Sequence, residues 1–79
     1  MIRDERRRAA LLAMLTVWKN FGDQSVLIDP RGRHWRPLKD AEALGWARWF
    51  GDRCRLEPAG IEQLIPYGVA VAVDAEAGP

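Results

Sequence analysis

The chain has 79 residues, of which 48% are hydrophobic and 29% charged, and its formal net charge is +1. This length indicates one small domain with a modest core, and the apolar fraction is too high for a disordered chain. One cysteine and one histidine exclude an internal disulfide and the usual structural zinc sites. We expect a single domain over residues 1–74, a flexible tail over 75–79, and no metal or cofactor.

Charge is distributed unevenly along the chain. All twelve Lys and Arg lie between Arg3 and Arg55, where seven acids leave a balance of +5. From Leu56 onward there are four acids and no Lys or Arg, a balance of −4. This asymmetry indicates either a basic contact face or two solvated surfaces of opposite sign.

Residues 3–20 are predicted to form a helix, with Asp4 as its N-terminal cap and Gly22 at its C-terminal end. Two apolar stripes cover most of its circumference: Ala9, Leu12, Ala13, Thr16 and Val17, and Leu11, Met14, Leu15 and Trp18. A homodimer through residues 3–20 is one way to bury both stripes. The basic start lacks a clear cleavage site and no stretch is long enough to span a membrane, so we expect a mature helix in a cytoplasmic protein.

A basic β-hairpin is predicted next. Ser25–Asp29 is typical of a strand, Asp29-Pro30-Arg31-Gly32 has the residue preferences of a type I turn, and Arg33–Arg36 is predicted to be the return strand. The expected register pairs Asp29 with Arg33, Ile28 with His34, and Leu27 with Trp35. Pro37 would end the second strand.

A short helix is predicted over Leu38–Leu44, after which the pattern allows two structures. The helix could continue to Phe50, which is slightly favoured, or Gly45 could stop it and residues 46–50 form a strand that turns at Gly51-Asp52. In both cases a strand follows at Arg53–Glu57, with Cys54 and Leu56 inward and Arg53 and Arg55 outward.

The last predicted elements are a short helix and a strand. Pro58 suits the first turn of a helix over Ala59–Ile65, and Val69–Val73 alternates valine with alanine as a strand would. The predicted fold is therefore α+β: a long N-terminal helix, a basic β-hairpin, one or two short helices and a small antiparallel sheet.

Nothing in the sequence forms a catalytic constellation. His34 stands alone on the predicted hairpin, and Cys54 on a strand is predicted to be a buried, inert thiol rather than a nucleophile. No glycine-rich phosphate loop occurs, and paired carboxylates are scattered. We therefore expect a protein that is not an enzyme.

Two clusters of basic and aromatic residues are the candidate partner-binding sites: Arg31, Arg33, His34, Trp35 and Arg36, and Trp46, Arg48, Trp49, Arg53 and Arg55. Arginine and tryptophan often dominate protein interfaces, and the same residues can contact phosphates. The alternative is structural, with tryptophans in the core and arginines keeping a sheet edge solvated. The run Arg6–Arg8 could also contact phosphates.

Residues 44–64, LGWARWFGDRCRLEPAGIEQL, resemble the end of a winged-helix DNA-binding domain. In that family a recognition helix precedes a two-stranded wing, and the chain often continues as Arg-x-Arg-Leu-Thr-Pro-x-Gly into a helix. Arg53, Arg55, Leu56, Pro58 and Gly60 occupy this pattern, with Glu57 in place of Thr. The resemblance implies that Leu38–Leu44 stands where the recognition helix would be and that the predicted hairpin replaces the preceding helix.

In size and character the chain also resembles the small accessory proteins of bacteriophages, which bind and inhibit or redirect one host protein, as anti-CRISPR proteins do. The function expected from this resemblance is a small non-enzymatic regulatory or inhibitory protein that binds a host protein or protein assembly. The alternative is a winged-helix-like DNA-binding regulator. We expect another protein as partner, with nucleic acid as the alternative and no membrane association.

Overall fold

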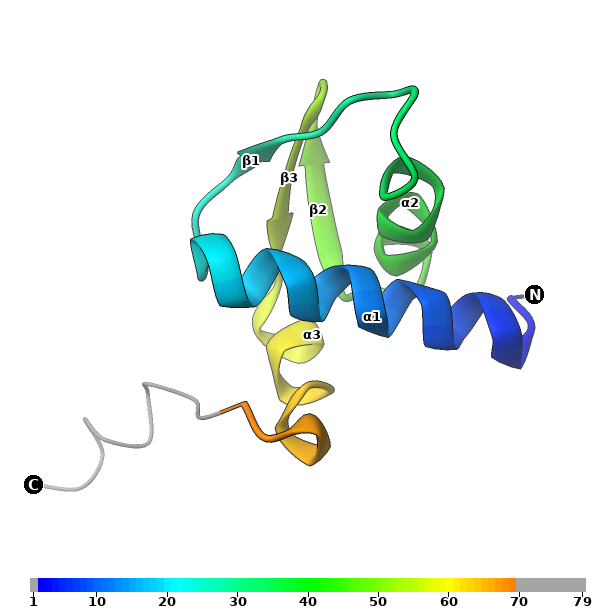
Figure 1. The fold of residues 1–79 in the computed structure, drawn as a ribbon, viewed down its shortest axis with the longest axis vertical. Helices are drawn as coiled ribbons and strands as arrows, with labels where there is room; N and C mark the ends of the chain where they lie inside the picture. The colour runs from blue at the N-terminus through cyan, green and yellow to red at the C-terminus, as the bar shows by residue number, and fades with distance from the viewer. Residues whose placement is uncertain (1, 70–79) are drawn as a thin grey trace, which may run out of the picture.

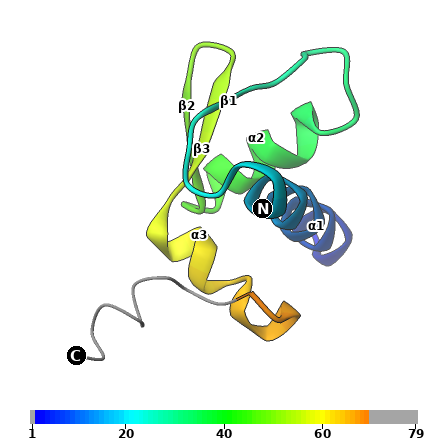
Figure 2. The ribbon, with the colours of Figure 1, turned by 60° about the vertical axis from the view of Figure 1, so that its left-hand side comes forward.

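The computed structural model describes residues 2–69 (Figure 1). The elements in chain order are α1 (Asp4–Phe21), β1 (Val26–Leu27), α2 (Trp35–Ala43), β2 (Ala47–Phe50), β3 (Arg53–Leu56), α3 (Pro58–Glu62) and the 3₁₀-helix η1 (Ile65–Tyr67). α1 crosses the middle of the molecule; α2 and the tip of the β2–β3 hairpin lie on one side of it, and η1 on the other (Figures 1 and 2). The expected α+β class, with a long first helix and a small antiparallel sheet, is confirmed.

The three strands form one antiparallel sheet in the order β1–β3–β2. β1 pairs with the start of β3, where Val26 is opposite Cys54 and Leu27 is opposite Arg53. β2 pairs with the whole of β3 from the other side. Alternate residues of β3 point to opposite faces, so its cysteine and leucine are buried and its two arginines are exposed, as predicted.

The predicted hairpin between Ser25–Asp29 and Arg33–Arg36 is wrong. β1 is only two residues long and pairs with β3, so the expected pairs do not form: Asp29 with Arg33, Ile28 with His34, and Leu27 with Trp35. The second half of the expected hairpin instead starts α2, whose first residue is Trp35. Pro37 lies in the first turn of that helix, where the backbone N–H that proline lacks has no helical partner in any case.

Residues 47–50 form a strand, so the slightly favoured longer helix is wrong and the alternative is confirmed. Gly45 lies in the turn between α2 and β2 with φ of 81°, a left-handed value that residues other than glycine rarely adopt. Gly51 has φ of 62° in the tight turn between β2 and β3. Because Ala47 and Trp49 face inward and Arg48 and Phe50 outward, the strand buries only half of this segment.

α1 confirms the helix predicted over residues 3–20, but Asp4 is its first residue rather than its cap. The cap position belongs to Arg3, whose side chain makes no capping hydrogen bond, while Gly22 closes the C-terminal end by donating its N–H to the Trp18 carbonyl. One face of α1 supplies a large part of the core, and its buried residues are Ala10, Ala13, Met14 and Val17.

α1 and α2 are joined by a charged contact as well as by apolar packing. The Arg6 guanidinium donates two hydrogen bonds to the Asp40 carboxylate, at 3.0 Å from Nε and 2.6 Å from Nη2. Asp40 is buried, and such a bidentate pair fixes both angle and position. The hydrogen bonds and charge of Asp40 raise the pKa of Arg6 above its usual value.

α3 packs against the core through its buried Gly60, which lies close to the Trp46 carbonyl and the Met14 side chain. The helix predicted over Ala59–Ile65 is shorter in the structure, and the 3₁₀ turn η1 follows it. Pro58 starts α3, as expected. Residues 70–73 of the predicted strand Val69–Val73 lie outside the described part of the chain.

Within residues 2–69, no helix is both long enough and apolar enough to cross a lipid bilayer.

Candidate functional site

The loop between β1 and α2 begins with the predicted turn. The Gly32 N–H donates to the Asp29 carbonyl at 2.9 Å, and the Arg31 N–H donates to the Asp29 carboxylate at 2.9 Å. A proline at the second position and a glycine at the fourth fit this turn. Arg31 and Arg33 are exposed, and within residues 2–69 neither guanidinium makes a hydrogen bond or an ion pair.

This loop lies at the same end of the molecule as the turn between β2 and β3 (Figures 1 and 2). The Ile28 N–H donates to the Asp52 carbonyl at 2.9 Å, which ties the two segments together. Arg36 is exposed in the first turn of α2, and Arg53 is exposed at the start of β3. We call the set Arg31, Arg33, Arg36 and Arg53 the arginine end.

Two of the candidate tryptophans hold α2 against β2, together with a lysine. The rings of Trp35 and Trp49 meet edge to face with centroids 4.7 Å apart, and the Lys39 ammonium lies 4.1 Å from the centroid of Trp49 and 4.9 Å from that of Trp35. Trp49 also donates its Nε1–H to the Leu38 carbonyl at 3.1 Å. These contacts give both indoles a structural role, and no sequence motif indicated that Lys39 takes part.

Trp46, one of the predicted contact residues, lies in the core. Its side chain is only 5% exposed, and the Arg7 guanidinium lies over its ring at 5.2 Å. Trp46 lies in the bend between Gly45 and β2, where its N–H donates to the Ala41 carbonyl and its carbonyl accepts from the Glu57 N–H, both at 2.9 Å. It therefore offers almost no surface to a partner.

Arg48 and Arg55 form a second group on the outer face of the sheet, directly opposite each other on β2 and β3. Two like charges in such a pair are unfavourable unless other groups compensate them. Arg48 lies 3.2 Å from the Glu57 carboxylate, and Arg55 donates to the Asp23 carbonyl at 2.9 Å. Both guanidiniums therefore have protein partners, unlike those of the loop.

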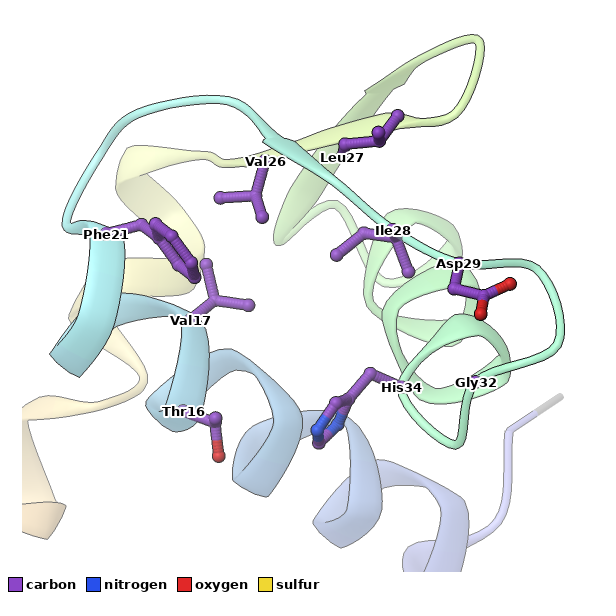
Figure 3. A pocket seen from close by; sticks show the side chains of 9 residues that line it. All are labelled: Thr16, Val17, Phe21, Val26, Leu27, Ile28, Asp29, Gly32 and His34. Atoms are coloured by element: carbon purple, nitrogen blue, oxygen red, sulfur yellow. The ribbon is translucent and has the colours of Figure 1, made fainter.

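His34 is half-buried rather than displayed at a hairpin tip. It lines an apolar groove between α1, β1 and the loop (Figure 3). The remaining walls come from α1 and β1, chiefly Val17, Phe21, Val26, Leu27 and Ile28. No sequence motif pointed to this groove, because it forms only when the fold brings the loop and α1 together.

Cys54 is fully buried in the centre of the sheet. Burial, with a smaller contribution from Glu42, raises the pKa of its thiol to about 11. This environment favours the neutral thiol and disfavours the thiolate that a nucleophile would need. Within residues 2–69, no three His, Cys, Asp or Glu side chains are grouped to hold a metal ion.

We expect alkylation of Cys54 in the folded protein at pH 8 to be at least about 100-fold slower than in the urea-unfolded chain, because a pKa of about 11 lowers the thiolate fraction by this factor. Timed alkylation followed by mass spectrometry measures both rates. Since the thiol ionises more readily when the chain unfolds, stability should also fall as pH rises from about 9 towards 11. Equal alkylation rates would contradict the burial of this residue.

Comparison of the chain with protein-family models, with curated proteins and with solved structures finds no match.

Proposed function

We propose that the protein is a small DNA-binding regulator that contacts the duplex through its arginine end. The observation that carries this proposal is that four exposed arginines lie on two segments of the chain that meet at the same end of the molecule. The hydrogen bond between Ile28 and Asp52 sets the spacing of these segments. Arginines held in this way can bind phosphate oxygens, the contacts that supply most of the affinity for nucleic acid.

The order of elements supports the same proposal. α2 is followed directly by the β2–β3 hairpin, as a recognition helix is followed by its wing in the family that residues 44–64 resemble. Arg53, Arg55 and Leu56 lie in the second strand of the hairpin, and Pro58 and Gly60 lie in the helix that follows. The loop between β1 and α2 would then stand in place of the helix that normally precedes the recognition helix.

The arginine end includes residues of α2 and of the β2–β3 hairpin. Arg36 lies on the exposed side of the first turn of α2, with Arg33 just before it, and Arg53 lies at the hairpin. A duplex bound at this end would be contacted by the helix and the hairpin together. Phosphate contacts of this kind position the protein, and no side chain of the set is assigned to a base.

Binding to a mixed-sequence duplex across a salt series tests the proposal. We expect a micromolar dissociation constant at low salt, with a slope of log affinity against log salt of roughly −3.6 for four phosphate contacts. Fluorescence anisotropy of a labelled duplex gives both values. Absence of binding at about 50 mM salt, where phosphate contacts are only weakly screened, would exclude the function.

Binding to another protein is the second candidate, as expected from the phage-type resemblance. The observation that favours it is an exposed row across the outer face of the sheet, where Arg53 is flanked by Leu27 and Phe50. These two side chains are 65% and 54% exposed. Apolar residues next to arginines are typical of protein interfaces, whereas an aliphatic side chain adds little to phosphate binding. A protein that inhibits a host protein by binding to it would make the contact through this row.

A further inference from the structure

α1 carries a second apolar stripe that the rest of the described chain covers only in part. Leu11, Leu15 and Trp18 lie along one side of the helix, and each is half-buried against the edge of the core. Leu12 lies beside them and is 54% exposed. We call these four residues the α1 patch. Large apolar side chains gathered on one exposed surface indicate a place that another group covers.

The α1 patch and the groove between α1 and β1 lie on opposite sides of the helix. Successive residues of an α-helix are about 100° apart, so the pair Leu15 and Trp18 points roughly opposite to Thr16 and Val17, which line the groove. The groove lies above α1 in Figure 1, and η1 lies below it. The α1 patch is therefore on the side of α1 where η1 lies.

The described part of the chain ends on this same side. Val69 follows η1 and packs half-buried against the core. The ribbon of the described residues ends there, below α1 (Figures 1 and 2). Residues 70–74 come next, and five extended residues span up to about 17 Å, the length of roughly three helical turns. The segment is thus long enough to cross the α1 patch.

The sequence of residues 70–74, AVAVD, suits an apolar surface. Valine alternates with alanine from Val69 to Val73, which is typical of an extended segment with one larger apolar face. In that conformation Val71 and Val73 share a face with Val69, and the alanines lie on the opposite face together with Asp74. Such a segment can bury its valines while its carboxylate stays in water.

Charge favours the C-terminal border of the α1 patch as the place where this segment ends. Lys19 is exposed there, and within residues 2–69 its ammonium makes no hydrogen bond or ion pair. Arg8 is exposed at the other border, but Asp4 and Glu5 lie within one turn of it, whereas the last turn of α1 contains no acid. The long Lys19 side chain can extend past the segment to the Asp74 carboxylate.

We propose that residues 70–74 of this chain dock on the α1 patch as an extended segment. Val71 and Val73 cover Leu15 and Trp18, and the Asp74 carboxylate lies beside the Lys19 ammonium. The docked segment occupies the apolar surface that a homodimer through residues 3–20 would otherwise use. This inference does not rest on DNA binding, because it involves no residue of the arginine end.

NMR relaxation of the full chain tests whether the segment is docked. We expect backbone order parameters of about 0.85 for residues 70–73, the value of rigid backbone, and Overhauser contacts from the valine methyl groups to the Trp18 indole. Val71→Ser/Val73→Ser should lower these order parameters below about 0.6 and leave residues 2–69 folded, which circular dichroism verifies. Wild-type order parameters below about 0.6, or valine contacts to Thr16 in the groove, would overturn the proposal.

A charge exchange tests the pairing with Lys19. Lys19→Glu should lower the order parameters of residues 70–73, and adding Asp74→Lys should restore them. Arg8→Glu is the matched control, an exposed cation at the other border of the α1 patch, and should leave them unchanged. Equal effects of the two reversals, including no effect of either, would overturn the proposal.

A mixed sample distinguishes this segment from that of a second copy. When labelled and unlabelled chains are combined, contacts between the valines and Trp18 should arise only within a chain. Contacts between a labelled and an unlabelled chain would show that another copy covers the α1 patch, and the proposal would fail.

Discussion

Replacing Arg33 and Arg36 together by glutamate is expected to weaken duplex binding by at least about 100-fold at 0.1 M salt. The change removes two phosphate contacts and places two anions in their position, and fewer counterions are then released from the duplex on binding. A 100-fold decrease in affinity corresponds to about 2.7 kcal/mol. Anisotropy titration of a labelled duplex measures it. The fold should be unaffected, because both side chains are exposed.

A neutral pair separates a specific contact from a general change in charge. Arg33→Gln/Arg36→Gln should make the salt slope less steep by about 1.8, whereas Arg48→Gln/Arg55→Gln, which removes the same charge, should leave it nearly unchanged. The second pair lies on the outer face of the sheet and already has protein partners. Equal effects of both pairs would mean that DNA responds only to net charge, and the arginine end would lose its assigned role.

Gly60→Ala is expected to destabilise the fold by about 3 kcal/mol or more, a large share of the stability of a domain of this size. A β-carbon at this position would fall inside contact distance of the Trp46 carbonyl oxygen and within 2.9 Å of the Met14 Cε. That carbonyl cannot retreat freely, because it accepts a hydrogen bond from the Glu57 N–H at 2.9 Å. The gain in helix propensity, about 1 kcal/mol, is too small to compensate.

Urea unfolding followed by circular dichroism measures this destabilisation. Gly51→Ala is the control, since an added β-carbon there meets open space and only the left-handed φ of 62° opposes it. We expect that control to cost about 1 kcal/mol. A Gly60→Ala protein within about 0.5 kcal/mol of wild type, the usual range for an uneventful surface substitution, would show that α3 can move away from Trp46 without penalty.

Elements with a strong local signal were predictable from the sequence. α1 has nearly the predicted bounds because its apolar periodicity runs over many turns, and β3 alternates cleanly between inward and outward residues. The turn at Asp29–Gly32 formed because proline and glycine fix it locally. The expected hairpin failed because strand pairing is decided by distant residues. β3 pairs with β2 on one side and with β1 on the other. Since β1 is paired with β3, residues 33–36 do not pair with it as a strand.

The candidate site was predictable in its arginines but not in its aromatic residues. Long cations stay near water whatever element carries them, so Arg31, Arg33, Arg36 and Arg53 are exposed although the predicted element around three of them was wrong. The exposure of a tryptophan depends on the element. The bend before β2 holds Trp46 in the core, and Trp49 of β2 packs against Trp35 of α2. Residue spacing alone could reveal neither arrangement.

The first helix separates its three consecutive arginines. Successive side chains leave a helix about 100° apart, so neighbours in sequence diverge in direction. Arg6 is bound to Asp40, Arg7 covers the Trp46 ring, and Arg8 is exposed. The three neighbouring arginines therefore do not form one uniform basic surface, although all three side chains remain exposed. The ion pair with Asp40 offsets one of the three charges, so the run attracts an approaching polyanion less strongly than its sequence implies.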